Sequence, residues 1–486
     1  MNQKKISFDD ATIESLFGAE DAENETESRF KEYFVKNKAY SNISADLSIR
    51  IAVGHKGVGK SAVLKRAYLD DTEQNKLSVW IQPNDISSLE SSSSISFNER
   101  IEIWKVGILK IIADKALDKI FQQKIIIPGE DEENLLKRPI NTILSIFRKN
   151  METYSDQVAE QTLHNFYENE VITVYIDDID RGWSASTSDI QSISALLNAV
   201  RDLAGTDSRL RFRLGLRSDV YFLVRTSDES TDKIERHVVW VEWTNNEILQ
   251  VIAKRIETFF DPTKDTSYIQ SMKQQDISKQ ILSKIIEPRF QGRGHWSNRY
   301  IHHVLLSLCR RRPRDLIKLL HSASRNAYKN DHDIITSNDL ESAFEPYSSE
   351  RLQDLVNEFK SEIPEIESLL LSMRPTKKGR RTAEGFQFTN DSMTVKLRDV
   401  IQQTNLTFRN RRPVNPKSLL HFLYKIDFVT ARKQMESGEI DRKYFDQSRF
   451  LANSVVDFGY NWEIHPAYRW ALSPQSIDDV FDSLRD

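Results

Sequence analysis

Eight residues between an apolar stretch and a helix-forming stretch constrain the fold of this chain more than any other feature. Gly54 to Ser61 read GHKGVGKS and follow the apolar run Ile49 to Val53. The spacing, a glycine, four residues and then Gly-Lys-Ser, lets backbone N–H groups without side chains approach phosphate oxygens. The strand-before, helix-after context predicts a phosphate-binding loop in an α/β domain. The alternative is a glycine-rich turn that holds no ligand.

Each position of this loop has its own task in a nucleotide site. Lys60 would reach the β- and γ-phosphate oxygens, and the hydroxyl of Ser61 would bind Mg²⁺. The motif predicts a nucleoside triphosphate with Mg²⁺ as the cofactors of this chain. The residues expected to contact the nucleotide are Gly54, His55, Lys56, Gly57, Val58, Gly59, Lys60, Ser61 and Ala62.

A second, acidic motif follows a strand further along the chain. Val171 to Ile176 is the apolar, β-branched run typical of a buried parallel strand, and Asp177 and Asp178 come directly after it. Ligands of open α/β sheets bind at the C-terminal ends of such strands. We therefore interpret Asp177 as the carboxylate on the Mg²⁺ side, beside Ser61, and Asp178 as the group that orients or deprotonates the attacking water. The alternative is an acidic turn that caps the next helix.

An arginine ends the next predicted strand. Arg217 follows residues 210–216 and would face the same edge of the sheet. Its planar guanidinium could bind the γ-phosphate in a bidentate manner and respond to whether ATP or ADP is present. The alternative is an ion pair with Asp177, Asp178 or Asp180.

A second arginine begins an amphipathic helix in the second half of the chain. Arg314 follows Pro313 in the run RRRPRDL, and a helix start fixed by proline could bring this arginine over the nucleotide. The alternative is a basic helix start that pairs with nearby acids or binds a partner.

Strand and helix patterns alternate through the first half of the chain. They predict an α/β fold, a P-loop NTPase parallel sheet of about five strands with helices on both faces. The expected strands are 49–53, 77–82, 171–176, 210–216 and 238–243. A capping pattern from Thr244 to Glu247 predicts a helix that runs to about Phe260. Helical periodicity follows over 262–344, and then short aromatic strands such as 386–388 and 426–429.

These patterns predict four parts of the chain. The first is an N-terminal helical entry segment, and the second is the P-loop ATPase core. A helical lid domain and a small α+β C-terminal domain follow. Their expected boundaries are 1–45, 46–261, 262–348 and 349–486.

Composition excludes several other classes of protein. The only cysteine is Cys309, so a disulfide framework and a multi-cysteine zinc site are ruled out. His302 and His303 stand beside Leu and Val in a helical pattern, and we interpret them as packing or surface residues rather than a metal pair. The N-terminal residues lack the apolar core of a secretory signal, and no segment has the apolar length of a membrane span. We expect a cytoplasmic protein with no membrane partner.

Two basic runs lie in the C-terminal part. The net charge is only −4, so any nucleic-acid site must be a local patch. Contact with DNA or RNA, contact with protein, and a solvated surface without a binding role all stay open for these runs. The nearby aromatic residues Trp462, Tyr468 and Trp470 are predicted to pack in a core rather than stack on bases. The candidate phosphate-contacting residues are Lys377, Lys378, Arg380, Arg381, Arg411 and Arg412.

Together these residues resemble the AAA+/STAND branch of P-loop ATPases, in particular the bacterial FunZ-like family. The resemblance is broad, and the order and spacing of its motifs carry it. The motifs are Gly18-Ala19-Glu20, the loop GHKGVGKSA, the acid motif IDDIDR, LRSDVY, Trp243-Thr244, RRPRDLI at 311–317, Tyr347-Ser348, and His465 to Ala471.

The resemblance implies roles that the residues alone do not. It implies ATP as the nucleotide, Arg217 as the sensor on the fourth core strand, Arg314 as the lid sensor, and a winged-helix-like domain over 349–486. AAA+ motors commonly have Asp-Glu where this chain has Asp177-Asp178, a pattern that resembles STAND and KAP-type ATPases and favours a slow switch.

The function implied is a regulatory ATPase that binds and hydrolyses ATP. The resemblance further implies a role in bacterial anti-phage defence or a mobile element, with an effector protein encoded nearby. No arginine finger acting on a neighbouring copy can be assigned, so a homo-oligomer stays open. Two rival functions are a non-hydrolysing, nucleotide-gated scaffold for a separate effector, and a DNA-loading ATPase similar to replication initiators.

Overall fold

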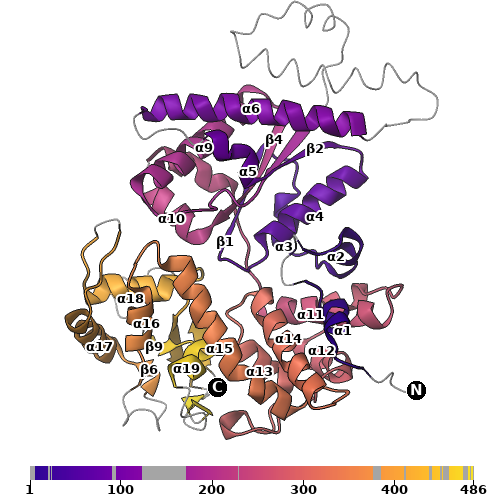
Figure 1. The fold of residues 1–486 in the computed structure, drawn as a ribbon, viewed down its shortest axis with the longest axis vertical. Helices are drawn as coiled ribbons and strands as arrows, with labels where there is room; N and C mark the ends of the chain where they lie inside the picture. The colour runs from indigo at the N-terminus through magenta and orange to yellow at the C-terminus, as the bar shows by residue number, and fades with distance from the viewer. Residues whose placement is uncertain are drawn as a thin grey trace, which may run out of the picture. The chain divides into compact units, whose positions relative to one another are not determined.

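The computed structural model divides the chain into two compact units (Figure 1). Residues Lys36–Glu242 form the first, called the sheet unit below, and Met1–Val35 with Trp243–Asp486 form the second, called the helical unit. The residues described are 6–19, 22, 24–89, 95–122, 171–227, 229–375, 385–409, 412–436, 440–448, 451–452, 459–473, 480–481 and 483–484.

A parallel sheet organises the sheet unit. In the described part of that unit it has five strands in the order β2-β3-β4-β1-β5, and every neighbouring pair is parallel. This confirms the predicted α/β fold. The strands are β1 (Ile49–Gly54), β2 (Leu77–Ile81), β3 (Ile172–Ile176), β4 (Leu210–Arg217) and β5 (Val238–Trp240).

The last strand is shorter than the sequence predicts. The predicted strand runs to Trp243, but β5 ends at Trp240, so the predicted end of this strand is wrong. β5 is an edge strand that pairs only with β1, and one further bond, from the N–H of Val241 to the carbonyl of Val53, closes the pairing. The chain then leaves the sheet, and Trp243 begins the second part of the helical unit.

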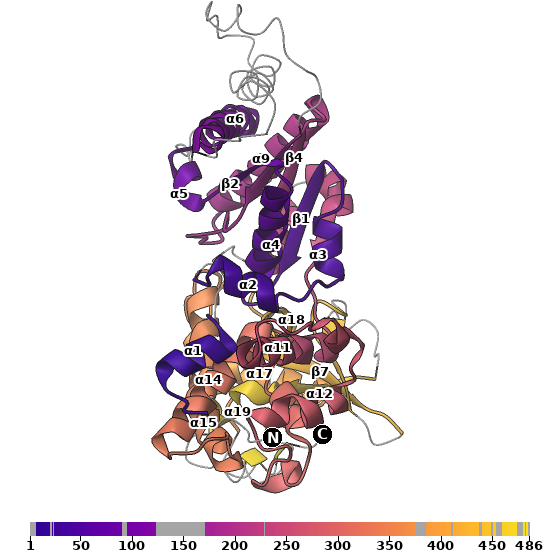
Figure 2. The same cartoon turned by 90° about the vertical axis from the view of Figure 1, so that its right-hand side faces the viewer.

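Helices cover both faces of this sheet, and Figure 2 shows α6 and α4 on opposite sides of it. On one face, Val174 and Ile176 belong to an apolar core shared with α6 and α9. On the other, the rings of Trp80 and Tyr175 stack at 5.9 Å and meet Tyr68 of α4. Burial on both sides explains why β3 is apolar and β-branched on both of its faces, with Thr173 as its one aliphatic hydroxyl residue. The helices are α3 (Lys38–Ile43), α4 (Lys60–Glu73), α5 (Pro83–Ile86), α6 (Phe97–Gln122), α9 (Thr187–Thr206) and α10 (Ser218–Ser227), with 3₁₀ helices η1 (Ser87–Leu89) and η3 (Glu229–His237).

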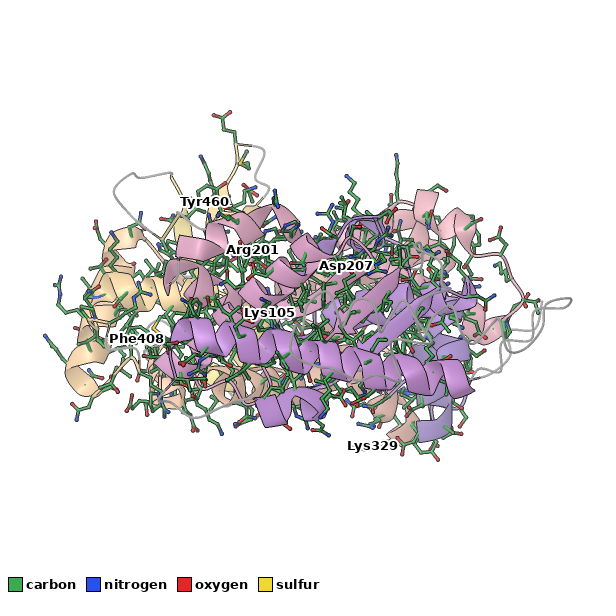
Figure 3. All side chains as sticks on the ribbon, turned by 90° about the horizontal axis from the view of Figure 1, so that it is seen from above. Lys105, Arg201, Asp207, Lys329, Phe408 and Tyr460 are labelled. Carbon is green, nitrogen blue, oxygen red and sulfur yellow. The ribbon has the colours of Figure 1, made fainter. Side chains whose placement is uncertain are left out.

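The outer side of α6 is polar. Lys105, labelled in Figure 3, is half-buried there and pairs with Glu102 one turn earlier at 2.8 Å. Such an i, i+3 pair stabilises a helix by only a few tenths of a kcal/mol, roughly. We therefore expect a substitution of Lys105 to leave the fold intact.

The helical unit begins its second part with the predicted capping box. The hydroxyl of Thr244 accepts a hydrogen bond from the N–H of Glu247, whose carboxylate accepts one from the N–H of Thr244. This confirms the predicted start of α11. The helices of this part are α11 (Asn245–Phe260), α12 (Gln274–Gln280), α13 (Ile301–Ser307), α14 (Pro313–Lys329), α15 (Ser337–Phe359) and α16 (Ile366–Ser372), with 3₁₀ helices η4 (Ser267–Ser271), η5 (Leu282–Lys284) and η6 (Gly294–Trp296).

The two N-terminal helices, α1 (Asp10–Phe17) and α2 (Glu27–Tyr33), pack on α11. Arg29 of α2 donates to the hydroxyl of Thr258 at 2.7 Å, and the guanidinium of Arg255 lies over the ring of Tyr33 at 4.0 Å. These contacts explain why the unit boundaries fall at 35 and 242, whereas the predicted domain boundaries are at 45 and 261.

A small antiparallel sheet follows, with strands in the order β6-β9-β7-β8. The predicted strand at 426–429 begins later, at Val429, because Asp427 has a φ of 57° and the chain turns there. Trp462, Tyr468 and Trp470 are all buried, which confirms their predicted packing role. The elements are β6 (Gln387–Phe388), α17 (Asn390–Gln403), α18 (Pro416–Lys425), β7 (Val429–Gln434), β8 (Ile440–Lys443), β9 (Asn461–Ile464), η10 (Pro466–Tyr468) and α19 (Arg469–Leu472).

Among the helices of the described ranges, none has both the length and the apolar content that a membrane span requires.

Candidate nucleotide-binding site

The predicted loop lies between the C-terminal end of β1 and the start of α4. Gly57 and Gly59 have φ values of 80° and 97°, which glycine adopts without steric strain. α4 begins at Lys60, and Gly59 at its N-cap supplies no side-chain cap. Backbone N–H groups in the first turn of a helix, with the positive end of its dipole, favour an anion at such a position.

The remaining loop residues divide into anchored and exposed groups. His55 is buried, and its Nδ1 lies 3.3 Å from the hydroxyl of Ser218 at the start of α10. This hydrogen bond links the loop to α10. Val58 is buried, Ala62 is half-buried on α4, and Lys56 is exposed.

The side chain of Lys60 curls back over the loop. Its Nζ donates to the carbonyl of Gly54 at 2.9 Å and to that of His55 at 3.0 Å. The ammonium also lies close enough to favour the ionised forms of Asp177 and Asp180. The loop lysine and these two acids therefore share one site.

Asp177 lies where the sequence predicts it, and only 5% of it is exposed. Burial raises the pKa of Asp177, while a hydrogen bond from the Ser61 hydroxyl and the charge of Lys60 oppose that rise. Within the described residues, its Oδ2 is buried without a hydrogen-bond partner. A buried carboxylate oxygen without a partner is unfavourable unless a cation compensates it. Ser61 and Asp177 thus offer the oxygen ligands that suit Mg²⁺.

Room for this carboxylate comes from a glycine in the neighbouring strand. A Cβ at Gly215 of β4 would lie 2.2 Å from Oδ1 of Asp177 and 3.1 Å from Cδ1 of Leu64. Only glycine leaves space for the buried acid here. The sequence analysis missed this residue, although a glycine inside a strand pattern is a known sign of close approach.

Asp178 and Asp180, the two acids that follow Asp177, differ in environment. Asp178 is exposed and has a φ of 58°, and its carbonyl accepts from the N–H of Arg181 in a tight turn. Asp180, which the sequence analysis treated only as a pairing partner, is 8% exposed. Burial raises the pKa of Asp180 to about 6, although Arg217 and Lys60 work against this rise. The structure therefore buries Asp177 and Asp180, both within reach of the charge of Lys60, and leaves Asp178 exposed.

Arg217 ends β4 beside the loop, since its backbone pairs with that of Gly54. Its guanidinium donates to Asp219 at 2.8 and 3.1 Å, and Nε lies 3.5 Å from Oδ2 of Asp180. The ion pair with Asp180 is one of the predicted alternatives. Asp219, in the first turn of α10, is a partner that sequence reasoning missed. Contact between Arg217 and a γ-phosphate stays a prediction.

Arg314 belongs to the helical unit, where it is the second residue of α14 and is half-buried. Two other arginines of the same run form ion pairs with acids of the helical unit. Arg310 binds Asp315 in a bidentate manner, with both distances 2.7 Å, and Arg312 binds Asp427 at 2.8 Å. The alternative of a basic helix start that pairs with acids thus holds for these two arginines. The sensor role of Arg314 stays a prediction.

Of the six basic residues predicted to contact nucleic acid, Arg412 is described and exposed. The other five lie outside the described residues; they are Lys377, Lys378, Arg380, Arg381 and Arg411.

The pKa of Asp180 gives a pH prediction. Its native value of about 6 exceeds the usual 3.8, so protonation favours the folded state. The stability that Asp180 contributes is fully present below pH 3.8 and is lost as the pH rises through about 6. We expect Asp180→Asn to gain up to about 3 kcal/mol in free energy of unfolding, relative to the native chain, between about pH 4 and pH 8.

Urea denaturation of the native chain and the variant at both pH values measures this change, with Asp202→Asn on α9 as the control. A difference between Asp180→Asn and the native chain that does not vary with pH would contradict it.

Comparisons with known proteins place part of the chain. Residues 246–356 match the family described as the FunZ-associated C-terminal helical domain. A putative transposon gamma-delta 80.3 kDa protein of Escherichia coli K12 is 22% identical over 335 residues, which cover 64% of this chain and 42% of that protein. The chain thus spans less than half of that relative. Allergen Alt a 2 of Alternaria alternata is 25% identical over 154 residues, covering 31% of this chain and 71% of the allergen.

Two solved structures of other proteins are distantly similar to this chain. The ORC2 protein of Aeropyrum pernix, in ADPNP–ADP complexes, has 12% identity and a TM-score of 0.41, with 94% of this chain and 96% of that chain covered. Cdc6p of Pyrobaculum aerophilum has 11% identity and a TM-score of 0.33, with 95% and 99% covered. Because both TM-scores are below 0.5, these structures do not support the fold assignment, which rests on the strand order of the chain itself. The narrower STAND and KAP-type placement stays a prediction, and the match to the FunZ-associated C-terminal helical domain covers residues 246–356, less than half of the chain.

Proposed function

We propose that this chain is a regulatory ATPase that binds ATP and hydrolyses it with Mg²⁺. One observation carries the proposal. The hydroxyl of Ser61, in the first turn after the glycine-rich loop, donates to the buried carboxylate of Asp177, which keeps one oxygen without a hydrogen-bond partner within the described residues. A phosphate-binding loop after β1, joined in this way to an acid at the end of β3, on the far side of β4, is what Mg²⁺-nucleotide chemistry requires.

Each residue of the site has a role in this proposal. Ser61 and Asp177 would hold Mg²⁺, which supplies neutralising charge for the phosphate oxygens when bound. Lys60 would exchange the carbonyls of Gly54 and His55 for those oxygens. Asp178, the exposed acid, would orient or deprotonate the attacking water. Arg217 would bind the γ-phosphate after release from Asp180 and Asp219.

The regulatory part of the proposal concerns the helical unit. We infer that Arg314 couples the position of the lid to the nucleotide and that residues 349–486 form a winged-helix-like domain, an inference supported by the element order β6, α17, α18, β7, β8, β9. The name of the E. coli relative refers to a transposon, which supports a mobile-element or defence setting. In that setting the switch would act on an effector protein, on nucleic acid, or within a homo-oligomer.

Steady-state ATP hydrolysis of the native chain and Asp178→Ala tests the proposal. We expect slow, Mg²⁺-dependent turnover in the native chain and a kcat lowered by about 100-fold or more in Asp178→Ala, with ATP affinity retained, because a general base contributes about that much. Asp202→Ala on α9 is the matched acidic control. Native turnover in Asp178→Ala would rule out this residue as the base.

The second candidate is the non-hydrolysing, nucleotide-gated scaffold. It is favoured by the exposure of Asp178 and by the two carboxylates that engage Arg217. Tight ATP binding with no turnover would select it, whereas turnover stimulated by DNA would select the DNA-loading alternative.

A further inference from the structure

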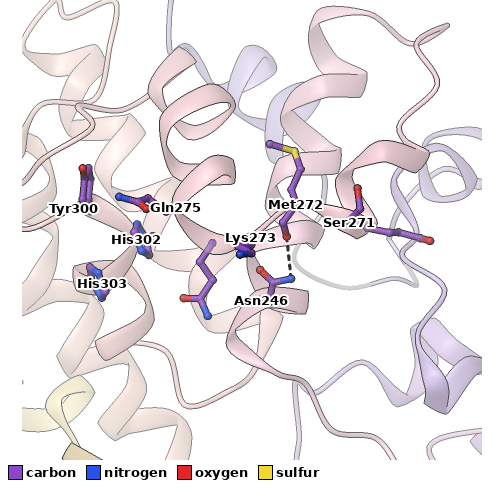
Figure 4. Close-up of a pocket in the computed structure, with 10 residues that line it drawn as sticks. Asn246, Ser271, Met272, Lys273, Gln275, Tyr300, His302 and His303 are labelled. Atoms are coloured by element: carbon purple, nitrogen blue, oxygen red, sulfur yellow. Dashed lines mark hydrogen bonds between the residues drawn. The ribbon is translucent and has the colours of Figure 1, made fainter. Parts of the chain in front are cut away.

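A second pocket lies within the helical unit, between the start of α11, the segment before α12, and the start of α13 (Figure 4). Its volume is 640 Å³, which is within the range of small-molecule sites. Of the ten described residues that line it, none is acidic, one is Met272, and the others carry amide, hydroxyl, imidazole, phenol or ammonium groups. This composition favours a polar ligand that carries negative charge.

One wall of the pocket is aromatic. The rings of Tyr300 and His302 stack with centroids 5.9 Å apart, and the ring of His303 lies 4.2 Å from that of His302. His302 is 3% exposed, and its Nδ1 is buried without a hydrogen-bond partner in the described ranges. Burial lowers the pKa of His302 to about 4, so this ring is neutral near pH 7. The half-buried ring of Tyr300 and the exposed ring of His303 are the parts of this wall that a planar heterocycle can reach, since every base has a π-face.

The facing wall offers an amide and is held in place by α11. Nδ2 of Asn246 donates to the carbonyl of Met272 at 3.2 Å, while its Oδ1 is buried and has no partner among the described residues. Gln250 donates to the carbonyls of Ile269 and Gln270 at 3.2 and 3.0 Å, which fixes the same segment. Asn side chains read the edges of bases through their amide groups. The pocket therefore has a side-chain amide, held in place by Met272, in the wall that faces the rings.

Three cations lie in the pocket wall or against the ring of Tyr300. Lys273 lines it and is exposed to solvent. Arg289 and Lys279 lie over the ring of Tyr300 at 4.1 and 5.3 Å. Ammonium and guanidinium groups are the usual protein ligands of phosphate.

We propose that this pocket binds a nucleoside monophosphate, with the base between the His302 ring wall and the Asn246 amide and the phosphate at Lys273. The same chemistry is found in a free nucleotide and in the 5′-phosphorylated end of a nucleic acid. This site is separate from the Gly54–Ser61 loop and does not depend on the proposed ATPase activity.

Isothermal titration of the full chain with AMP, GMP, CMP and UMP tests this proposal. We expect saturable binding of at least one of them, weakened about tenfold or more in Lys273→Ala and in His303→Ala, two exposed residues whose loss leaves the core intact. Lys329→Ala, exposed at the end of α14 and labelled in Figure 3, is the matched control and should bind like the native chain. Lys60→Ala should also leave this binding unchanged.

Four further results would support or overturn the proposal. Tighter binding of a 5′-phosphorylated dinucleotide than of any mononucleotide supports the pocket and identifies a nucleic-acid end as its ligand. Failure of all four mononucleotides to bind, or binding that Lys273→Ala and His303→Ala leave unchanged, overturns the proposal. Equal binding of inorganic phosphate also overturns it, because the ring wall would then contribute nothing.

Discussion

Gly215→Ala is expected to lower the free energy of unfolding by about 1 to 3 kcal/mol and to weaken Mg²⁺-ATP binding strongly. The new methyl group would lie 2.2 Å from Oδ1 of Asp177, and the carboxylate can move away only by giving up its position beside Ser61. Both stability and nucleotide affinity should therefore fall together.

Urea denaturation and an ATP titration of the same protein measure the two effects. Gly205→Ala is the matched control, since a Cβ at this position of α9 would meet no atom within 4 Å. In a helix, this replacement should raise stability by about 0.5 to 1 kcal/mol. Native stability and native ATP affinity in Gly215→Ala would show that the carboxylate of Asp177 is not held where the structure places it.

Asp315→Ala is expected to destabilise the helical unit by about 3 to 5 kcal/mol, because it leaves buried charges without a partner. Asp315 accepts two hydrogen bonds from the guanidinium of Arg310 and one from its backbone N–H, and it lies 3.5 Å from Arg351. All three side chains are buried. Although burial works to raise it, Arg310 and Arg351 hold the pKa of Asp315 below its usual value. Arg310 also donates to the hydroxyl of Tyr468 at 2.8 Å, so the loss should spread to the C-terminal part.

Thermal and urea unfolding followed by circular dichroism measure this loss. Asp276→Ala, an exposed acid in the first turn of α12, is the control and should change stability by less than about 1 kcal/mol. An effect of Asp315→Ala as small as that of the control would mean that the charge network adds nothing to the fold.

The sequence was sufficient for the parts of the site that depend on local pattern. An apolar run followed by GHKGVGKS predicts β1, the loop and α4, and an apolar run followed by two acids predicts β3 and Asp177. Thr244 and Glu247 likewise predict the start of α11, because both residues of a capping box lie within four consecutive positions of the sequence.

Features that depend on backbone torsion or on a neighbouring strand could not be predicted in this way. Asp177, Asp178 and Asp180 look alike in the sequence, and the left-handed φ of Asp178 accompanies the turn in which Asp178 is exposed and Asp180 is buried. Gly215 matters only because β4 lies beside β3 in the sheet. The partners of Arg310 and Arg312 are likewise decided by tertiary packing, since Asp427 lies more than a hundred residues away in the chain.

Binding of Mg²⁺-ATP to the full chain, measured by isothermal titration, tests the central claim most directly. The native chain should bind ATP with one site per chain in the presence of Mg²⁺, and Lys60→Ala should weaken this binding by about tenfold or more, because a charge-assisted contact with phosphate is lost. Lys105→Ala on α6 should bind like the native chain. Equal ATP affinity in the native chain and in Lys60→Ala would contradict the account.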